Sequence, residues 1–214
     1  MANEITQKLK ASLLALDMDA TMGQVNLVVK GDADVTVQEA VDAVAEALEV
    51  VGKRFQGGEW FLAELVYSGE IAKSAMELLS PLMSSGVSQP LGTIVVGTVA
   101  GDLHDLGKNI FINYSKSAGF EVVDLGIDVP VEKFVSAVDE YKPLALGMSC
   151  LLTITSEEVG KVIEGLKTQG NRDKVKVIIG GAALTEEFAQ EVGADAFAPD
   201  AITGTDIIKV WSAS

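Results

Sequence analysis

Cysteine and histidine are almost absent from this sequence. Among 214 residues there is one cysteine, Cys150, and one histidine, His104. A single cysteine excludes an internal disulfide and suits a reducing compartment. Zinc or iron bound by side chains alone would need several His, Cys or carboxylate ligands, so a metal site built only from protein ligands is not expected.

Long apolar runs and basic residues are also scarce. No run approaches the roughly 20 apolar residues that a membrane-spanning helix needs. The first residues, MANEITQKLK, lack the basic and then apolar pattern of a secretory signal. The 16 Lys and Arg face 31 Asp and Glu, a formal net charge of -15, which repels phosphate backbones and anionic membranes. We expect a soluble, cytoplasmic protein that binds neither nucleic acid nor membrane.

The first part of the chain, residues 1–88, has apolar residues at helical spacing. Thr36, with Glu39 three residues later, predicts a capping box at the start of one helix. Turn residues are expected to separate the helical stretches, at 17–23, 31–34 and 57–58. The last stretch is expected to stop at Pro81, because proline disrupts a helix interior. The pattern predicts a helical-bundle domain of about four antiparallel helices.

The second part, residues 89–214, has a different pattern. The polar stretch 84–92 before it contains glycine and proline without periodicity and predicts a linker. Beyond it, β-rich runs alternate with helical stretches; the runs are TIVVGTV, EVVDLGI, LALGMSC, VKVIIGG and AFAP. This repeated βα pattern predicts an α/β domain with a doubly wound, five-stranded parallel sheet, Rossmann-like or flavodoxin-like, with strand order 2-1-3-4-5. Ligands of such folds bind beyond the carboxyl ends of the strands.

The loop after the first strand, GDLHDLGKN, contains the single histidine. A lone loop histidine is often only a solvated side chain, but His104 lies between Asp102 and Asp105, in a loop bracketed by Gly101 and Gly107. A carboxylate beside an imidazole fixes its tautomer and strengthens its free nitrogen as a metal ligand. The loop lacks the spacing of a phosphate-binding P-loop. A single histidine ligand makes sense where a macrocycle supplies the other metal bonds.

The residues around this histidine resemble a known family. The run VVGTVAGDLHDLGKNI resembles the D-x-H-x-x-G signature of corrinoid-binding domains, including that of methionine synthase and those of methyltransferase corrinoid proteins. The likeness continues through FEVVDLGIDVP, GMSCLLTIT and VIIGG. It implies a cobalamin or related corrinoid as cofactor, with its cobalt bound by His104 and with Asp102 as the hydrogen-bond partner of the imidazole. In this family the histidine displaces the cofactor's own nucleotide base from the cobalt, and the nucleotide tail then enters a groove in the protein.

The same resemblance implies further site residues. Thr155 takes the place of a hydroxyl residue that extends the Asp–His pair into a relay, although with Glu158 it also matches a capping box for the next helix. Ser149 and Thr153 line the groove, and Gly180 and Gly181 end a strand there, where a plain turn would need glycine too. Cys150 is expected in the core. The full set of cofactor-binding positions is Phe55, Leu62, Gly101, Asp102, Leu103, His104, Asp105, Gly107, Ser149, Leu151, Thr153, Gly180, Gly181 and Ala201.

The helical part resembles the cap of methylcobalamin proteins, in the run VVGKRFQGGEWFLAELVYSGEIAKSAMELLSPL. That resemblance places Phe55 and Leu62 over the upper face of the corrinoid, where they shield the methyl group. On composition alone, either would be taken as bundle core. Val41 stands where a cap glutamate of methionine synthase approaches the corrin, so that contact is expected to be missing.

The implied function is that of a methyl carrier, which cycles between cob(I)alamin and methylcob(III)alamin and is not an enzyme on its own. It would require a donor-specific methyltransferase, an acceptor methyltransferase that uses tetrahydrofolate or a thiol, and a reductive activator of Co(II). The resemblance favours O-demethylation of aryl methyl ethers, with methanol, methylamine or betaine corrinoid proteins as alternatives. An adenosylcobalamin isomerase subunit and a B12-dependent sensor are the remaining readings.

Overall fold

The structure is a computed structural model, and it describes residues 4–83 and 90–213. The chain divides into two compact units, Met1–Gln89 and Pro90–Ser214. Most of the expected linker, residues 84–89, lies outside the described residues. None of the described helices is long and apolar enough to cross a bilayer.

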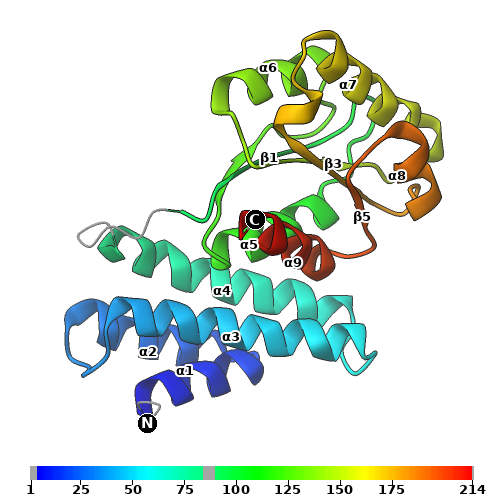
Figure 1. Cartoon of the computed structure of the whole chain (residues 1–214). Coiled ribbons are helices and arrows are strands. Elements are labelled where there is room, and N and C mark those ends of the chain that lie inside the picture. Colours follow the sequence, from blue (N-terminus) through cyan, green and yellow to red (C-terminus); the bar gives the residue numbers. More distant parts are fainter. Residues whose placement is uncertain (1–3, 84–89, 214) are drawn as a thin grey trace. The chain divides into compact units, whose positions relative to one another are not determined.

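Four helices make up the described part of the first unit (Figure 1). They are α1 (Glu4–Leu14), α2 (Met18–Lys30), α3 (Val37–Gln56) and α4 (Leu62–Met83). The predicted capping box is confirmed, because the Thr36 hydroxyl accepts from the Glu39 N–H while the Glu39 carboxylate accepts from the Thr36 N–H. Fully buried aliphatic side chains from all four helices form the core, among them Leu9, Leu13, Val25, Val44, Val51, Ile71 and Leu79.

Two of the predicted helix boundaries in this unit are wrong. Residues 17–23 are not a turn: Asp17 is the N-cap of α2, and its side chain accepts from the Ala20 N–H at 2.9 Å. The last helix does not stop at Pro81 but ends at Met83. Only two residues follow the proline in α4, so the hydrogen bond that proline cannot make is lost in the final turn.

The second unit is a five-stranded parallel sheet in the order β2-β1-β3-β4-β5, which confirms the predicted doubly wound fold. Its strands are β1 (Thr93–Thr98), β2 (Glu121–Asp124), β3 (Ala145–Ser149), β4 (Lys176–Gly180) and β5 (Ala196–Ala198). The helices are α5 (Leu106–Ser117), α6 (Val131–Tyr141), α7 (Glu157–Thr168), α8 (Glu186–Val192) and α9 (Ala201–Ser212), with 3-10 turns η1 (Thr153–Thr155) and η2 (Arg172–Lys174).

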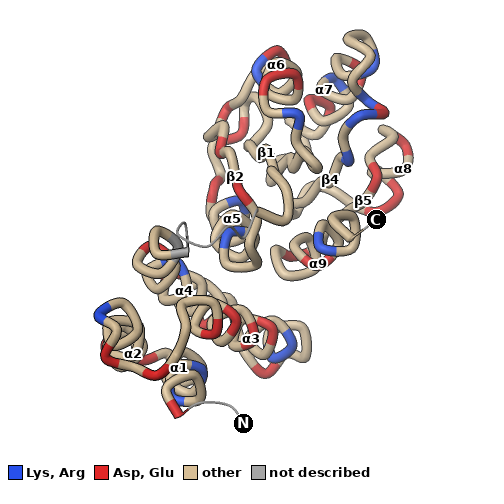
Figure 2. The backbone as a smooth tube through the Cα atoms, turned by 60° about the vertical axis from the view of Figure 1, so that its left-hand side comes forward, with Lys and Arg blue, Asp and Glu red and all other residues tan. Residues whose placement is uncertain are grey.

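Helices cover both faces of this sheet (Figure 1). Buried residues of α6, α7 and α8 pack on one face, where Phe134 and Leu146 are fully buried. On the other face α5 and α9 pack around Ile94 and Ile208. The central strands β1 and β3 carry no charged residue, and the acidic and basic residues lie mainly on helices and loops (Figure 2). Charged side chains of this unit therefore lie outside its two central strands.

Candidate functional site

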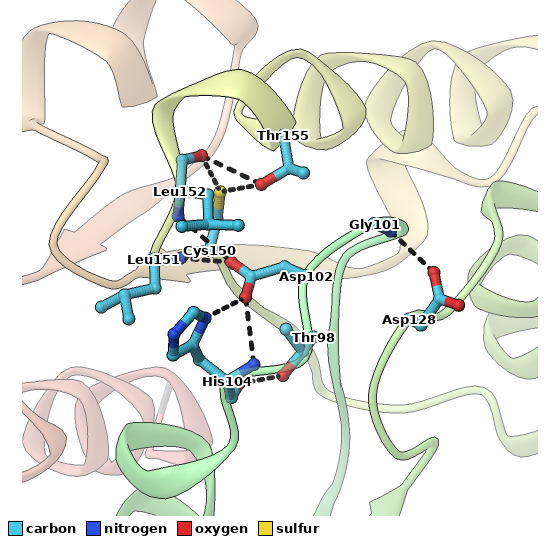
Figure 3. Close-up of polar contacts among 9 residues, drawn as sticks. All are labelled: Thr98, Gly101, Asp102, His104, Asp128, Cys150, Leu151, Leu152 and Thr155. Carbon is cyan, nitrogen blue, oxygen red and sulfur yellow. Dashed lines mark hydrogen bonds and ion pairs between the residues drawn. The ribbon is translucent and has the colours of Figure 1, made fainter.

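The single histidine lies in the loop between β1 and α5, beyond the carboxyl end of β1. At the end of that strand the Thr98 hydroxyl donates to the backbone carbonyl of His104 at 3.0 Å. Nδ1 of His104 lies 2.7 Å from Oδ1 of Asp102, and the His104 backbone N–H donates to the same oxygen at 3.0 Å (Figure 3). The His104 side chain is 53% exposed, whereas Asp102 is fully buried. The predicted Asp–His contact is therefore present.

The second carboxylate oxygen of Asp102 is held by the loop that follows β3. Oδ2 accepts the backbone N–H of Leu151 at 2.6 Å and that of Leu152 at 3.2 Å. Burial by itself would raise the pKa of Asp102, but the N–H groups of His104, Leu151 and Leu152 together hold this pKa below its usual value. Asp102 is therefore ionised near neutral pH. Because a carboxylate only accepts hydrogen bonds, it fixes the proton of the imidazole on Nδ1 and leaves the Nε2 lone pair free.

Apolar side chains are exposed on these two loops and at the start of α5. Leu103 and Leu106 flank the histidine, 66% and 51% exposed, and Leu151 and Ile154 project from the loop after β3, 41% and 81% exposed. Proteins in water seldom leave neighbouring large aliphatic side chains exposed without a ligand or partner to cover them. The exposed imidazole thus stands among side chains that suit a broad apolar ligand.

A cavity of about 150 Å³ lies next to this loop, at the carboxyl ends of β1, β3 and β4. Of the predicted site residues, five line it: Gly107, Ser149, Gly180, Gly181 and Ala201. Thr153 does not, since it lies in the exposed turn η1. The rest of the lining is mostly apolar and was missed: Val96, Lys108, Phe111, Gly147, Met148, Ile178, Ile179, Ala198, Pro199 and Asp200.

At two glycines of this cavity, neighbouring backbone leaves no room for a side chain. A Cβ on Gly180 would lie 2.9 Å from the carbonyl oxygen of Ala198, and one on Gly181 would lie 2.1 Å from that of Cys150. Gly181 also has a φ of +120°, which L side chains rarely adopt. The packing of neighbouring backbone is thus sufficient to require glycine at both positions.

Thr155 and Cys150 lie behind Asp102. The Thr155 hydroxyl donates to the Leu152 carbonyl at 2.9 Å and lies 3.4 Å from Sγ of Cys150, so its partners are not the Asp102 carboxylate (Figure 3). The expected capping box of Thr155 and Glu158 is wrong, because Thr155 ends the turn η1 and α7 begins at Glu157 after Ser156. Cys150 is fully buried, as expected, and burial raises the pKa of its thiol.

The expected cap residues belong to the first unit. Leu62 is the first residue of α4 and is 49% exposed, and Phe55, near the end of α3, is partly exposed. Neither is part of the fully buried core, in contrast to the bundle-core interpretation. Val41 is buried within α3.

Two polar residues near the site escaped the sequence analysis. Lys108 is 4% exposed, and its Nζ donates to both carboxylate oxygens of Asp124 at 2.8 Å and to Asn109 at 3.0 Å. The other is Asp128, in the loop after β2, whose carboxylate accepts the Gly101 N–H at 2.7 Å. A buried lysine in a helix has no local signal, since its partner lies sixteen residues away.

Comparison with known proteins decides what kind of site this is. A family model described as a B12 binding domain matches residues 92–205, and a second B12 binding domain model matches residues 5–80. The chain belongs to the B12-binding, or corrinoid, protein family. A dimethylamine corrinoid protein of Methanosarcina barkeri is 37% identical over 200 residues, covering 92% of each chain.

Solved structures of similar proteins agree with this assignment. A cobalamin-binding protein from Desulfitobacterium hafniense has 38% identity and a TM-score of 0.79, covering 97% of this chain and 98% of that one. A methanol:cobalamin methyltransferase complex from Methanosarcina barkeri has 25% identity and a TM-score of 0.83, covering 99% of this chain and 80% of that one.

The geometry of this corrinoid protein fits its cofactor. Among the described residues, no group of three or more His, Cys, Asp or Glu side chains could hold a metal ion. The exposed imidazole offers a metal one bond, which suits a metal whose other bonds are supplied by a macrocycle. The exposed leucines beside it suit the edge of a corrin ring, and the adjoining cavity can receive a smaller group. A corrinoid with its cobalt is the cofactor of this family.

Proposed function

We propose that this chain carries methyl groups on the cobalt of a bound corrinoid, as the corrinoid subunit of a multi-component methyltransferase. The observation that carries the proposal is the exposed His104, held by the buried and ionised Asp102 so that Nε2 is free to bind a metal. When bound, the cobalt supplies the chemistry, accepting a methyl group from one partner and giving it to another.

The residues of the second unit then have distinct roles. His104 would hold the cobalt through Nε2, while Asp102 keeps the imidazole proton on Nδ1 and orients the ring. Leu103, Asp105 and Leu151 would contact the corrin. Gly107, Ser149, Gly180, Gly181 and Ala201 line the cavity that would take the nucleotide tail. Thr155 supports the loop after β3 through the Leu152 carbonyl. In the first unit, Phe55 and Leu62 would shield the methyl group, a role supported by the sequence resemblance.

Partner proteins complete the function. We infer a donor-specific methyltransferase, an acceptor methyltransferase using tetrahydrofolate or a thiol, and a reductive activator of Co(II). The likeness to a methanol:cobalamin methyltransferase complex supports such partners. For the methyl donor, the likeness to a dimethylamine corrinoid protein supports a methylamine. An aryl methyl ether as donor stays a prediction from the sequence.

Electron paramagnetic resonance of the Co(II) form tests the assignment of His104. We expect coupling to one imidazole nitrogen, and its loss in His104→Ala. Isotopic labelling of the protein's nitrogen changes the coupling pattern only if the coupled nitrogen belongs to the protein and not to the base of the cofactor. Because the chain has no second histidine, a changed pattern identifies His104. Asp139→Asn, which changes a carboxylate of α6 that accepts from Asn171, is the control and keeps the coupling. Coupling to nitrogen of the labelled protein that persists in His104→Ala would falsify the assignment.

A second experiment separates the methyl carrier from the isomerase and sensor readings. The reduced Co(I) protein is mixed with methyltransferases and methylamine, methanol or aryl methyl ether donors, and methylation is followed by absorbance. Methylation by any of these pairs supports the carrier. Tight and productive binding of the adenosyl form, without methylation by any pair, would favour the isomerase subunit.

A further inference from the structure

The loop that follows β2 is hydrogen-bonded to the backbone beside the proposed cobalt-binding histidine. The Gly101 N–H donates to Oδ1 of Asp128 at 2.7 Å (Figure 3). In the opposite direction, the Asp128 N–H donates to the backbone carbonyl of Asp102 at 3.1 Å. Just outside this pair, Val99 and Val129 form an isolated parallel bridge. One residue thus makes two reciprocal hydrogen bonds to the peptide units on either side of the Gly101–Asp102 link.

Asp128 makes these bonds from an unfavourable backbone conformation. Its φ is +50°, and among the described residues only Leu16 and Lys142 share a positive φ without being glycine. Glycine would adopt this conformation freely, as Gly126 does two residues earlier with a φ of +93°. Glycine has no carboxylate, however. In Asp128 the unfavourable φ is combined with a short hydrogen bond from the Gly101 N–H to a carboxylate. A hydrogen bond to a carboxylate is stronger than one between neutral groups.

Two different loops hold Asp102 by hydrogen bonds. The loop after β3 holds its carboxylate, through the N–H groups of Leu151 and Leu152. The loop after β2 holds its backbone, through Asp128. The Asp102 N–H also donates to the Val99 carbonyl at 3.2 Å, and the Thr98 hydroxyl donates to the His104 carbonyl. Asp128 adds hydrogen bonds to the Gly101 N–H and the Asp102 carbonyl, and these fix the peptide units from which the direction of the imidazole follows.

We propose that Asp128 is a positioning residue for the cobalt ligand, which acts through Gly101 and Asp102 and does not touch the cofactor itself. This inference rests on the proposed role of His104. It predicts that loss of the side-chain oxygen that accepts from the Gly101 N–H leaves the protein folded but lowers the share of molecules with the imidazole on cobalt.

The decisive variants are Asp128→Gly and Asp128→Asn. Glycine removes the acceptor and relieves the backbone strain, so the fold is retained; asparagine accepts left-handed backbone and keeps an oxygen for the Gly101 N–H. Lys142→Gly is the matched control, because it relieves a φ of +45° at the end of α6. Folding of each apo-protein is checked by circular dichroism, and the Gly101 N–H is followed by nuclear magnetic resonance.

The readout is the ratio of imidazole-bound to imidazole-free Co(II), from the nitrogen coupling in electron paramagnetic resonance. For Asp128→Gly we expect this ratio to fall about tenfold, the lower end of the effect of residues that orient a metal ligand. Asp128→Asn and Lys142→Gly should stay near wild type. A wild-type ratio in Asp128→Gly, or an equal fall in Lys142→Gly, overturns the positioning role while His104 keeps its own. Absence of imidazole coupling in the wild-type protein would instead overturn the proposed function.

Discussion

At the scale of single residues, the site depends on one buried carboxylate with four hydrogen bonds. Asp102 accepts from the backbone and ring of His104 and from the backbone of Leu151 and Leu152. Three of these donors belong to the main chain and are kept in every substitution of those residues except one to proline. Any replacement at position 102 therefore meets N–H groups that point at it, and the replacement must accept hydrogen bonds at both of its outer atoms.

This geometry predicts the effect of Asp102→Asn. The amide has no charge to strengthen the imidazole as a ligand, and weaker axial ligation favours Co(I), which prefers fewer axial ligands. We therefore expect the Co(II)/Co(I) midpoint potential to rise, as measured by spectroelectrochemistry of the loaded protein. Asp139→Asn, whose carboxylate accepts from Asn171 in the wild-type protein, is the control and should leave the potential unchanged. A potential in Asp102→Asn equal to wild type would make the carboxylate purely structural.

The same variant has an independent signature without cofactor. In Asp102→Asn, the NH₂ group of the new side chain would face backbone N–H donors, at a cost of about 1–3 kcal/mol in the free energy of unfolding. The folded state lowers the pKa of Asp102, so its charge stabilises the fold above the usual carboxyl pKa of about 3.9 and this stability is lost as pH falls through the lower folded value. Urea unfolding from pH 7 to pH 3 should show the difference between wild type and variant shrink as pH falls.

At the scale of helices, strands and loops, much of the fold could be predicted, because its signals are repeated along many residues. Five alternating β-rich runs define the sheet and its order, and the Thr36 capping box was correct. Single boundaries were harder. Asp17 is a residue type common to turns and to N-caps, so its identity alone does not say which it is. Thr155 matched a capping box in sequence, but a 3-10 turn delays the start of the helix by one residue, and Ser156 becomes the N-cap.

The site was predictable where it is local and unpredictable where it depends on distant partners. The Asp102–His104 contact spans two residues and follows from the motif. From the sequence, Lys108 would be taken as a surface lysine. In the fold, Asp124 at the end of β2 lies against it and accepts its hydrogen bonds. Asp128 carries no sign of its role, because that role depends on a backbone angle and on Gly101, 27 residues away.

Two glycines with positive φ, one after α7 and one after β4, give a prediction at this scale. In Gly170→Ala the new methyl group meets open space, so only the left-handed backbone, φ +67°, opposes it, at about 1–2 kcal/mol. Gly181→Ala adds a clash with the Cys150 carbonyl, 2.1 Å away, and should cost clearly more. Urea unfolding of both variants measures the two costs. Because Gly181 lines the cavity, its variant should also bind cobalamin more weakly, whereas Gly170→Ala should bind normally.

At the scale of the whole molecule, the two units divide the work unequally. The histidine, its carboxylate partner and the lined cavity all lie in the second unit. In the first unit, the proposed contribution rests on Phe55 and Leu62, which are not part of its fully buried core. A carrier must shield a reactive methyl group in transit and expose it at each transfer, so a separate helical unit suits a cover that can move.

Photolysis of the methylcobalamin form tests this division. If Phe55 and Leu62 shield the methyl group, replacing both with alanine loosens the cage around the cobalt–carbon bond. Radical pairs then escape before they recombine, and photolysis becomes faster. The partial exposure of both side chains predicts a modest loss of stability, so circular dichroism should show an intact bundle.

The control is a second pair of alanines within the bundle core, at Val51 and Leu65, which are 0% and 2% exposed. Large-to-small changes at buried positions cost about 2–5 kcal/mol for a leucine, so this pair should lower the unfolding temperature of the helical unit. Measured well below that temperature, it should leave the photolysis rate near wild type. Faster photolysis in both pairs would trace the effect to a loosened bundle. An unchanged rate in the Phe55 and Leu62 pair would mean that these side chains do not cover the methyl group.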